Sequence, residues 1–324
     1  MVTYWQNHPN TTVPMTSRSR NAPVYGKSLH PPPEAIILTD DCIAEVRDLT
    51  VRFGDLTAVD GLSFDVRRGE IFGFLGPNGA GKTTTIRTIT TLQRPTSGKV
   101  LIGGHDTSTE YIEARRLIGI AQQHIALDKD LTVRQNIRHH AMLHKLPKEE
   151  TEERIGYAAD LLGLRDYMDR KVDTLSGGWK RKASIVCAIV HRPQLLLLDE
   201  PSAGLDTRSR RILWDLVREL NSGGTTILLT PHYLEEAEAL CDRVAVINHG
   251  RMVACGTVGE LRDAIGGVAV DRTAGGHLTT RFFRTRAEAS EYASGLGDEY
   301  YNVRRTTLED VFLELTGEDR GGLS

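Results

Sequence analysis

The feature that most constrains the fold is the glycine-rich stretch GPNGAGKTT at residues 76–84. It follows the apolar run IFGFL, which predicts a buried strand, and it precedes a predicted helix from about Lys82 to Leu92. Glycines let a backbone curl until successive N–H groups point at phosphate oxygens, and the helix N-terminus adds its positive dipole end. Strand, loop and helix in this order predict a phosphate-binding loop in an α/β protein.

Two side chains of this loop, together with its backbone, can contact a nucleotide and its metal ion. The Lys82 ammonium can reach the β- and γ-phosphates of a nucleotide, and the Thr83 hydroxyl can bind Mg²⁺. An ordinary glycine-rich turn is the alternative, and the flanking strand and helix disfavour it. The expected nucleotide contacts are Gly76, Pro77, Asn78, Gly79, Ala80, Gly81, Lys82, Thr83 and Thr84. Kinases, GTPases and ATPases share such loops, so the loop predicts nucleotide binding and leaves the function open.

Four other polar residues follow three apolar runs. LLLLDEP places Asp199 at a strand end, where it can hold Mg²⁺ through water, and Glu200 beside it can orient and deprotonate an attacking water. His232 follows the strand TTILLT, at the kind of strand end where open α/β sheets bind ligands. Gln123 follows the apolar run IGIA and can reach Mg²⁺ and the water. Each residue taken alone has a structural or surface alternative; the phosphate loop favours the functional interpretation.

The chain divides into three predicted parts. Residues 1–40 are rich in Asn, Thr, Ser and Pro, which predicts a disordered extension. Residues 41–265 form the main domain, with a hairpin over 43–66, helical patterns over about 107–175, and short apolar runs typical of parallel strands. Residues 266–324 form a small C-terminal region that ends in the amphipathic stretch TLEDVFLELTG.

Composition excludes several classes of protein. The formal net charge is −3, so no broad basic field favours nucleic acid as a partner. No apolar run approaches the roughly 18 to 20 residues that span a bilayer, and no secretory signal is visible. The four cysteines are widely spaced, which is typical of reduced thiols. The sequence therefore predicts a cytosolic protein that another subunit would have to hold at a membrane.

The motifs together resemble those of one family. GPNGAGKTT, IGIAQQ, LSGGWKRK, LLLLDEPSAGLD and LLTPHYLEEAEALCDRVAVINHGRMVACG occur in the order found in the nucleotide-binding subunits of ABC transporters. The resemblance covers about residues 43–262, and it is greatest to the daunorubicin-resistance type of drug exporter ATPase. The stretch TLEDVFLELTG resembles the C-terminal tail of that group. It implies an α/β P-loop NTPase of ABC ATPase type. Such a domain has a mixed core sheet, an antiparallel β subdomain and a helical subdomain, here about 124–180, with a small C-terminal extension.

The resemblance also implies how the site works. Two copies would dimerise head to tail, with each ATP between the phosphate loop of one copy and the LSGG segment of the other. The LSGG residues Ser176, Gly177 and Gly178 would read the γ-phosphate across the dimer, and Asp206 would cross the interface. Phe53 would stack on adenine, with a core strand residue as the alternative. The implied catalytic residues are Glu200, His232, Lys82 and Gln123, and the implied Mg²⁺ ligands are Thr83, Gln123 and Asp199.

Two departures from the family pattern stand out. Trp179 follows LSGG where the family usually has glutamine. Its indole could pack against the partner's ribose or the interface, or it could slow closure, and the sequence does not choose. The region 267–306 looks short for the accessory domain of this group, so the sequence assigns it no regulatory role.

The predicted function is that of the ATP-binding and ATP-hydrolysing subunit of an ABC exporter. It would lie at the cytoplasmic face of the membrane and energise a separate permease that expels a drug-like or lipophilic compound. One alternative is a non-transport ABC ATPase acting on ribosomes or DNA, although the chain lacks a second fused ATPase domain or a long coiled coil. The others are an importer ATPase, which the exporter-like tail disfavours, and an inactive binding module, for which only Trp179 argues.

Overall fold

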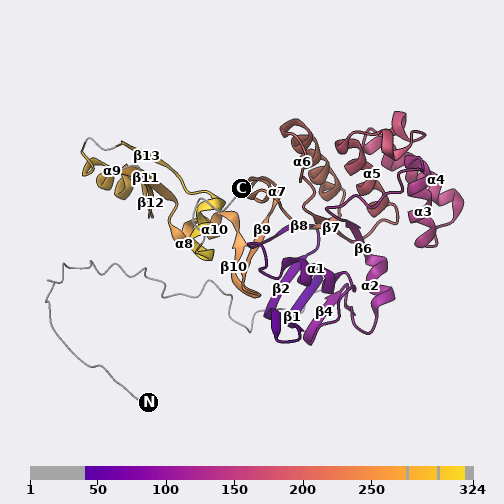
Figure 1. The fold of residues 1–324 in the computed structure, drawn as a ribbon, viewed down its shortest axis with the longest axis horizontal. Helices are drawn as coiled ribbons and strands as arrows, with labels where there is room; N and C mark the ends of the chain where they lie inside the picture. Colours follow the sequence, from indigo (N-terminus) through magenta and orange to yellow (C-terminus); the bar gives the residue numbers. More distant parts are fainter. Residues whose placement is uncertain (1–40, 275–276, 298–299, 318–324) are drawn as a thin grey trace, which may run out of the picture.

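The fold was analysed in a computed structural model, which describes residues 41–274, 277–297 and 300–317. The predicted disordered extension at 1–40 lies outside the described residues. Figure 1 shows a central sheet with an antiparallel sheet below it, a group of helices to one side, and a C-terminal part on the other side.

The central sheet supplies the edge on which the site is built. Its strand order is β10-β9-β3-β8-β7-β6, and all neighbours are parallel except β10 and β9. The strands are β3 (Ile71–Leu75), β6 (Ile118–Ala121), β7 (Leu195–Asp199), β8 (Thr226–Thr230), β9 (Arg243–Asn248) and β10 (Arg251–Thr257). The structure confirms the predicted parallel strands. Because β3, β8, β7 and β6 are neighbours, their carboxyl ends form one continuous edge.

An antiparallel sheet packs against one face of the central sheet. Its order is β2-β1-β4-β5, from β1 (Cys42–Phe53), β2 (Leu56–Arg67), β4 (Ser97–Ile102) and β5 (His105–Asp106). Phe64 of β2 stacks on Phe72 and Phe74 of β3, with ring centroids 5.6 Å and 5.2 Å apart. The predicted hairpin is therefore confirmed, while β4 and β5 come from a segment for which the sequence predicted no strands.

Helix α1 (Lys82–Ile89) is shorter than the prediction, which extended it to Leu92. Thr90 caps the helix, and Thr91 has a positive φ of 63°, a conformation that ends a right-handed helix. Helix α2 (Tyr111–Leu117) then leads directly into β6.

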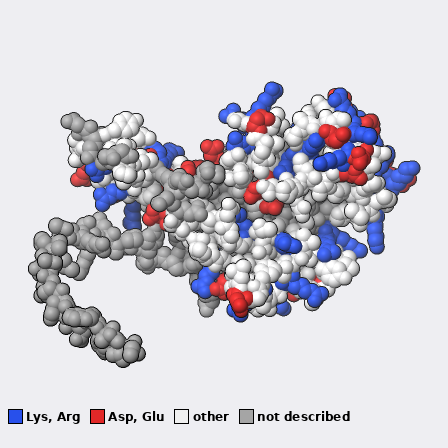
Figure 2. Space-filling view, viewed as in Figure 1, with Lys and Arg blue, Asp and Glu red and all other residues white. Residues whose placement is uncertain are grey.

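The opposite face of the central sheet is covered by helices. They are α3 (Val133–Leu143), α4 (Lys148–Leu161), α5 (Gly177–Ile189) and α6 (Thr207–Ser222), with α7 (Leu234–Leu240) beyond them. Leu196 and Leu198 of β7 belong to the same buried cluster as Ile137 and Ile185 of the helices. Alternate residues of β7 face the antiparallel sheet instead, which is why this strand reads as a continuous apolar run. Figure 2 shows Lys and Arg interspersed with Asp and Glu over this helical group on the visible face.

The C-terminal region contains more structure than the sequence analysis recognised. Strands β11 (Val268–Ala274), β12 (His277–Phe283) and β13 (Tyr300–Arg305) form an antiparallel sheet accompanied by α9 (Arg286–Ser294). Helix α8 (Val258–Ile265) leads into this sheet, and α10 (Leu308–Thr316) follows it. Leu308, Val311 and Phe312 of α10 are buried in one cluster with Val244 and Val246 of β9. The predicted amphipathic tail is thus a helix packed on the core.

One arginine fastens α10 to the C-terminal sheet. Arg304 donates to both oxygens of Asp310, at 2.5 Å and 2.8 Å, and to Asp271 of β11 at 2.7 Å. Burial opposes ionisation of Asp310, but Arg304 and the backbone N–H of Thr307 outweigh it and lower its pKa to about 2. The ionised carboxylate therefore stabilises the folded protein.

We expect Asp310→Asn to destabilise α10 by roughly 2 kcal/mol at neutral pH. The folded-state pKa lies below the ordinary value of 3.8, so the contribution is complete above about pH 4 and is lost as the pH falls towards 2. Hydrogen exchange of the α10 amides, compared with wild type at pH 7 and pH 3, measures the difference. The neighbouring exposed Glu309→Gln is the control, and an Asp310→Asn effect of equal size at both pH values would contradict the assignment.

Candidate functional site

The phosphate loop joins β3 to α1. The Lys82 ammonium folds back over the loop and donates to the carbonyls of Gly76 and Pro77, at 2.5 Å and 3.0 Å. Thr83 lies in the first turn of α1, where the backbone N–H groups have no partner within the helix. The loop therefore presents an ammonium, a hydroxyl and a helix N-terminus in one place, which suits an anionic phosphate chain.

Two glycines of this loop are required by close backbone approaches. A Cβ atom at Gly76 would lie 2.5 Å from the carbonyl oxygen of Ile247 in β9. A Cβ atom at Gly81 would lie 2.5 Å from the carbonyl oxygen of Ala58 in β2, and Gly81 also has a φ of 102°. The antiparallel sheet thus supports the loop from below. Phe53, about half exposed, ends the β1 strand of the same hairpin.

Two predicted residues, Gln123 and His232, converge on one carboxylate oxygen of a third, Glu200. Gln123 follows β6, Glu200 follows β7 and His232 follows β8, so they project from adjacent strand ends. The Gln123 amide donates to Glu200 Oε2 at 2.8 Å, and His232 Nδ1 lies 3.3 Å from the same oxygen. The Glu200 side chain remains about one quarter exposed. This arrangement can hold a carboxylate in a fixed orientation while leaving it open to a water molecule.

Asp199 lies beside this group at the end of β7. It pairs in register with Thr230, the last residue of β8, whose hydroxyl donates to Asp199 Oδ1 at 2.6 Å. In the described part of the chain, no group of three or more His, Cys, Asp or Glu side chains is arranged to hold a metal ion. One carboxylate and the Thr83 hydroxyl nevertheless fit Mg²⁺, which is usually held by one or two protein oxygens together with substrate phosphates.

The backbone of Glu200 is strained. Its φ is 43°, a left-handed conformation that non-glycine residues rarely adopt. The Glu200 N–H donates to the Thr230 carbonyl at 2.9 Å, and the Glu200 carbonyl accepts from Arg181 at 3.2 Å. Such strain costs about 1–3 kcal/mol and persists because neighbouring contacts hold it. The result is a carboxylate aimed towards Gln123 and His232.

Sequence reasoning missed Arg181, which is almost fully buried. Its guanidinium donates to the carbonyls of Gln122 at 2.5 Å, Gln123 at 3.1 Å and Glu200 at 3.2 Å. Burial lowers its pKa, while the charge of Asp199 acts in the opposite sense. Because Arg181 belongs to α5, it ties this helix to the loops that carry the site. The only signal was its position in the KRK run directly after LSGGW.

Glu236 was missed as well. It is fully buried in α7 and accepts hydrogen bonds from the Ser202 hydroxyl at 2.8 Å and the Trp214 indole at 3.2 Å. Burial raises its pKa, against the lowering effect of Ser202 and of a backbone hydrogen bond from His232. Glu236 therefore joins the segment after β7, helix α6 and the segment after β8.

The LSGG residues lie at the start of α5, within the helical group rather than beside α1 (Figure 1). Ser176 is the N-cap residue, and its hydroxyl makes no capping bond. A Cβ atom at Gly178 would lie 3.5 Å from the Ser209 hydroxyl of α6. Asp206 caps α6 and accepts from both the N–H and the hydroxyl of Ser209, at 2.9 Å and 2.7 Å. The structure thus brings Ser176, Gly178 and Asp206 to one surface, separate from the Glu200 group.

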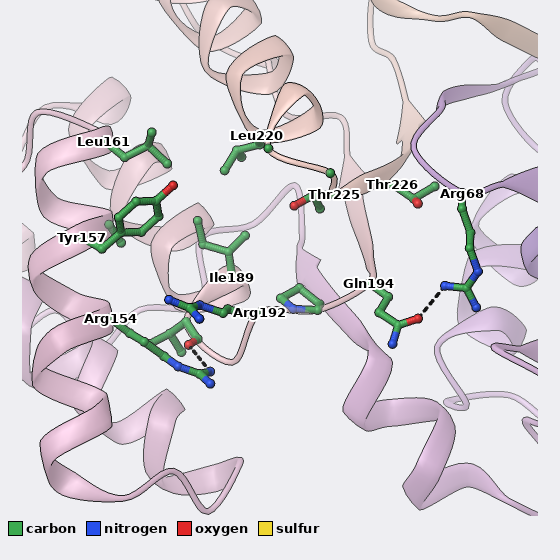
Figure 3. A pocket seen from close by; sticks show the side chains of 15 residues that line it. Arg68, Arg154, Tyr157, Leu161, Ile189, Arg192, Gln194, Leu220, Thr225 and Thr226 are labelled. Atoms are coloured by element: carbon green, nitrogen blue, oxygen red, sulfur yellow. Dashed lines mark hydrogen bonds between the residues drawn. The ribbon is translucent and has the colours of Figure 1, made fainter.

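Two cavities lie outside the Glu200 group. One of about 320 Å³ separates the first turns of α5 and α6, and Trp179 and Asp206 are among its lining residues. The larger one, of about 560 Å³, lies where β7 and β8 begin, at the opposite edge from the site (Figure 3). Figure 3 shows Arg68 donating to Gln194 there, at 2.6 Å. No helix in the described ranges combines the length and the apolar character needed to cross a membrane.

Comparison with known proteins places the chain in a family. The family described as "ABC transporter" matches residues 59–203. The daunorubicin resistance ATP-binding protein DrrA3 of Streptomyces coeruleorubidus is 39% identical over 83% of this chain and 94% of its own length. The Nod factor export ATP-binding protein I of Cupriavidus metallidurans is 36% identical over 86% of this chain and 98% of its own length.

Solved structures agree with these relatives. A structure described as the ATP-binding subunit of an ABC transporter has a TM-score of 0.65 and 28% identity, over 84% of this chain and 99% of that one. The predicted fold class and family resemblance are confirmed, since these matches extend well beyond the phosphate loop. With its phosphate loop at one end of the strand edge and Glu200 held between Gln123 and His232, the chain belongs to the ABC transporter family, as an ATP-binding subunit that hydrolyses ATP.

Proposed function

We propose that this chain is the ATPase subunit of an ABC exporter, and that it drives a separate membrane permease that expels a drug-like or lipophilic compound. The observation that carries the ATPase assignment is the convergence of Gln123 and His232 on Glu200, at the strand edge that also holds the phosphate loop. Export rests on the relatives, whose names describe daunorubicin resistance, linearmycin resistance and Nod factor export.

The proposed chemistry gives each group of the site a role. The loop amides and Lys82 bind the phosphate chain of ATP, and Phe53 stacks on the adenine. Gln123 and His232 orient Glu200, which accepts the proton of the water that attacks the γ-phosphate. Mg²⁺, which we assign to Thr83, Gln123 and Asp199, neutralises phosphate charge when it is bound with ATP.

We further propose that two copies act together as a head-to-tail homodimer. One copy carries a single phosphate loop and a single LSGG segment, and these lie on different parts of the fold. In the dimer, Ser176, Gly177 and Gly178 of one copy face the γ-phosphate held by the other, and Asp206 contacts the partner. ATP binding would then close the dimer, and hydrolysis would release it.

The proposed place of work is the cytoplasmic face of the membrane, where the permease holds the subunit. We expect a tagged copy, extracted from its own cells in mild detergent, to bring with it a polytopic membrane protein that mass spectrometry identifies. An untagged strain processed in parallel is the control. Enrichment of ribosomal or DNA-repair proteins without any permease would contradict the transporter assignment and favour a non-transport ATPase.

A further inference from the structure

Trp179 lines the same cavity as Ser176 and Gly178, and its ring also contacts an aromatic residue of the helical group. Its indole stacks on the ring of Tyr167, which belongs to the short 3-10 turn Arg165–Tyr167 just after α4. The ring centroids are 4.1 Å apart, and the planes are inclined by 26°. The side chain is partly buried and packs against the core cluster of the helical group. The indole is therefore engaged within its own chain.

Two cations extend this pair into a four-membered stack. The Arg170 guanidinium lies 4.9 Å from the Tyr167 ring centroid, and the Lys182 ammonium lies 4.6 Å from that of Trp179. The Lys182 ammonium also donates to the carbonyl of Leu162, the residue that caps α4, at 3.0 Å. A cation over an aromatic face and an offset aromatic pair are both attractive, more so when partly desolvated. The stack of Arg170, Tyr167, Trp179 and Lys182 therefore links the end of α4 to the start of α5.

We propose that Trp179 is a positioning residue, which holds the first turn of α5 so that Ser176 and Gly178 can read the γ-phosphate of ATP bound by the partner. This inference rests on the head-to-tail dimer of the proposed function. Trp179 is the third residue of α5, and the first N–H with a partner inside the helix is that of Lys180, which donates to the Ser176 carbonyl. The turn that offers free amides is thus the turn that the indole fixes.

Besides the stack, the start of α5 is held by a hydrogen bond from the Lys180 ammonium to the Asp173 carbonyl, at 3.1 Å. The cavity of about 320 Å³ lies on the α6 side of this turn, with Trp179 as part of its wall. Truncation of the indole would remove the ring contact with Tyr167 and part of the wall of this cavity. Arg181 would still hold the later part of α5 through the carbonyls of Gln122 and Gln123. The expected defect is therefore confined to the LSGG turn.

Symmetry enlarges the expected effect. A twofold dimer contains two LSGG turns, so a threefold loss at each turn multiplies to about a tenfold weaker dimer. The phosphate loop of the same chain lies elsewhere in the fold, so its affinity for ATP should change less than about twofold. A residue needed only for folding would instead affect both quantities.

The test uses full-length protein carrying Glu200→Gln, in which slow hydrolysis lets the ATP-bound dimer accumulate. Sedimentation with ATP and Mg²⁺ measures dimerisation, and a fluorescent ATP analogue measures the affinity of the monomer. The variants are Trp179→Ala, Trp179→Phe, Tyr167→Ala and the double alanine. Tyr157→Ala, an exposed tyrosine of α4, is the matched control.

The proposal expects Trp179→Ala and Tyr167→Ala each to weaken the dimer about tenfold. It also expects the double variant to be no worse than either single one, and Trp179→Phe to restore most of the affinity. If the Trp179→Ala dimer dissociates with a constant within twofold of that of the parent, the proposal is wrong. The proposal is also wrong if Trp179→Ala weakens the dimer and Tyr167→Ala does not, because the indole would then contact the partner directly. If the parent protein remains monomeric with ATP, the head-to-tail dimer fails instead, and the inference falls with it.

Discussion

Replacing Glu200 by glutamine is expected to slow ATP hydrolysis by a factor of about one hundred or more, in line with the loss of a general base. Glutamine keeps the size of the side chain and offers an oxygen to the Gln123 amide and His232, so the site should retain its shape. It cannot accept the proton of the attacking water. ATP binding should therefore persist while turnover becomes much slower.

Steady-state phosphate release and equilibrium binding of a fluorescent ATP analogue measure the two effects separately. Glu235→Gln is the matched control, because this exposed glutamate lies in the first turn of α7, close to His232 in the sequence. A Glu200→Gln rate within tenfold of wild type would mean that another group activates the water. Loss of nucleotide binding together with turnover would mean that Glu200 shapes the site rather than acting as its base.

The second large effect is expected at Gly81. An added methyl group would stand 2.5 Å from the Ala58 carbonyl, and that backbone cannot rotate away as a side chain would. We expect Gly81→Ala to lower the free energy of unfolding by about 3 kcal/mol or more and to abolish nucleotide binding. The loop can relieve the contact only by leaving β2, and its amides would then lose their common direction.

Gly79→Ala provides a matched control within the same loop. Gly79 also has a positive φ, 80°, but a Cβ atom there would meet nothing within 4 Å. Its cost should be the conformational strain alone, about 1–2 kcal/mol. Denaturant unfolding without nucleotide compares the two variants. Equal destabilisation would show that left-handed strain, and not the contact with Ala58, makes Gly81 necessary.

Local patterns predicted the parts of the fold that depend on local physics. The apolar runs at β3, β7 and β8 predicted buried parallel strands, because a strand covered on both faces needs apolar side chains at every position. Strand ends then placed Asp199, Glu200 and His232 at one edge. The distances that join Gln123, Glu200 and His232 came only from the structure, since they depend on the order β8-β7-β6.

The strands and contacts that the sequence analysis did not predict leave no local pattern of apolar residues in the sequence. Strands β12 and β13 are largely exposed and carry polar or charged residues on both faces, so alternation gave no strand signal. Arg181 is 59 residues from Gln122 in the sequence, and Glu236 is 34 residues from Ser202. Partners that distant meet only through tertiary packing. Trp179 and Tyr167 are closer in the sequence, but Tyr167 lies in the 3-10 turn after α4 and contacts Trp179 only through tertiary packing.

The hydrogen bonds of Arg181 are sensitive to substitution of the donor residue but not of the acceptor residues. All three of its acceptors are main-chain oxygens, so sequence drift at Gln122, Gln123 or Glu200 leaves them in place. A change at position 181 removes every one of these hydrogen bonds at once. Lysine cannot reproduce the planar fork that reaches three separate carbonyls, so even the conservative Arg181→Lys replacement should lose these hydrogen bonds. Among functional copies position 181 should therefore stay arginine even where the side chain of Gln122, which the site does not use, changes.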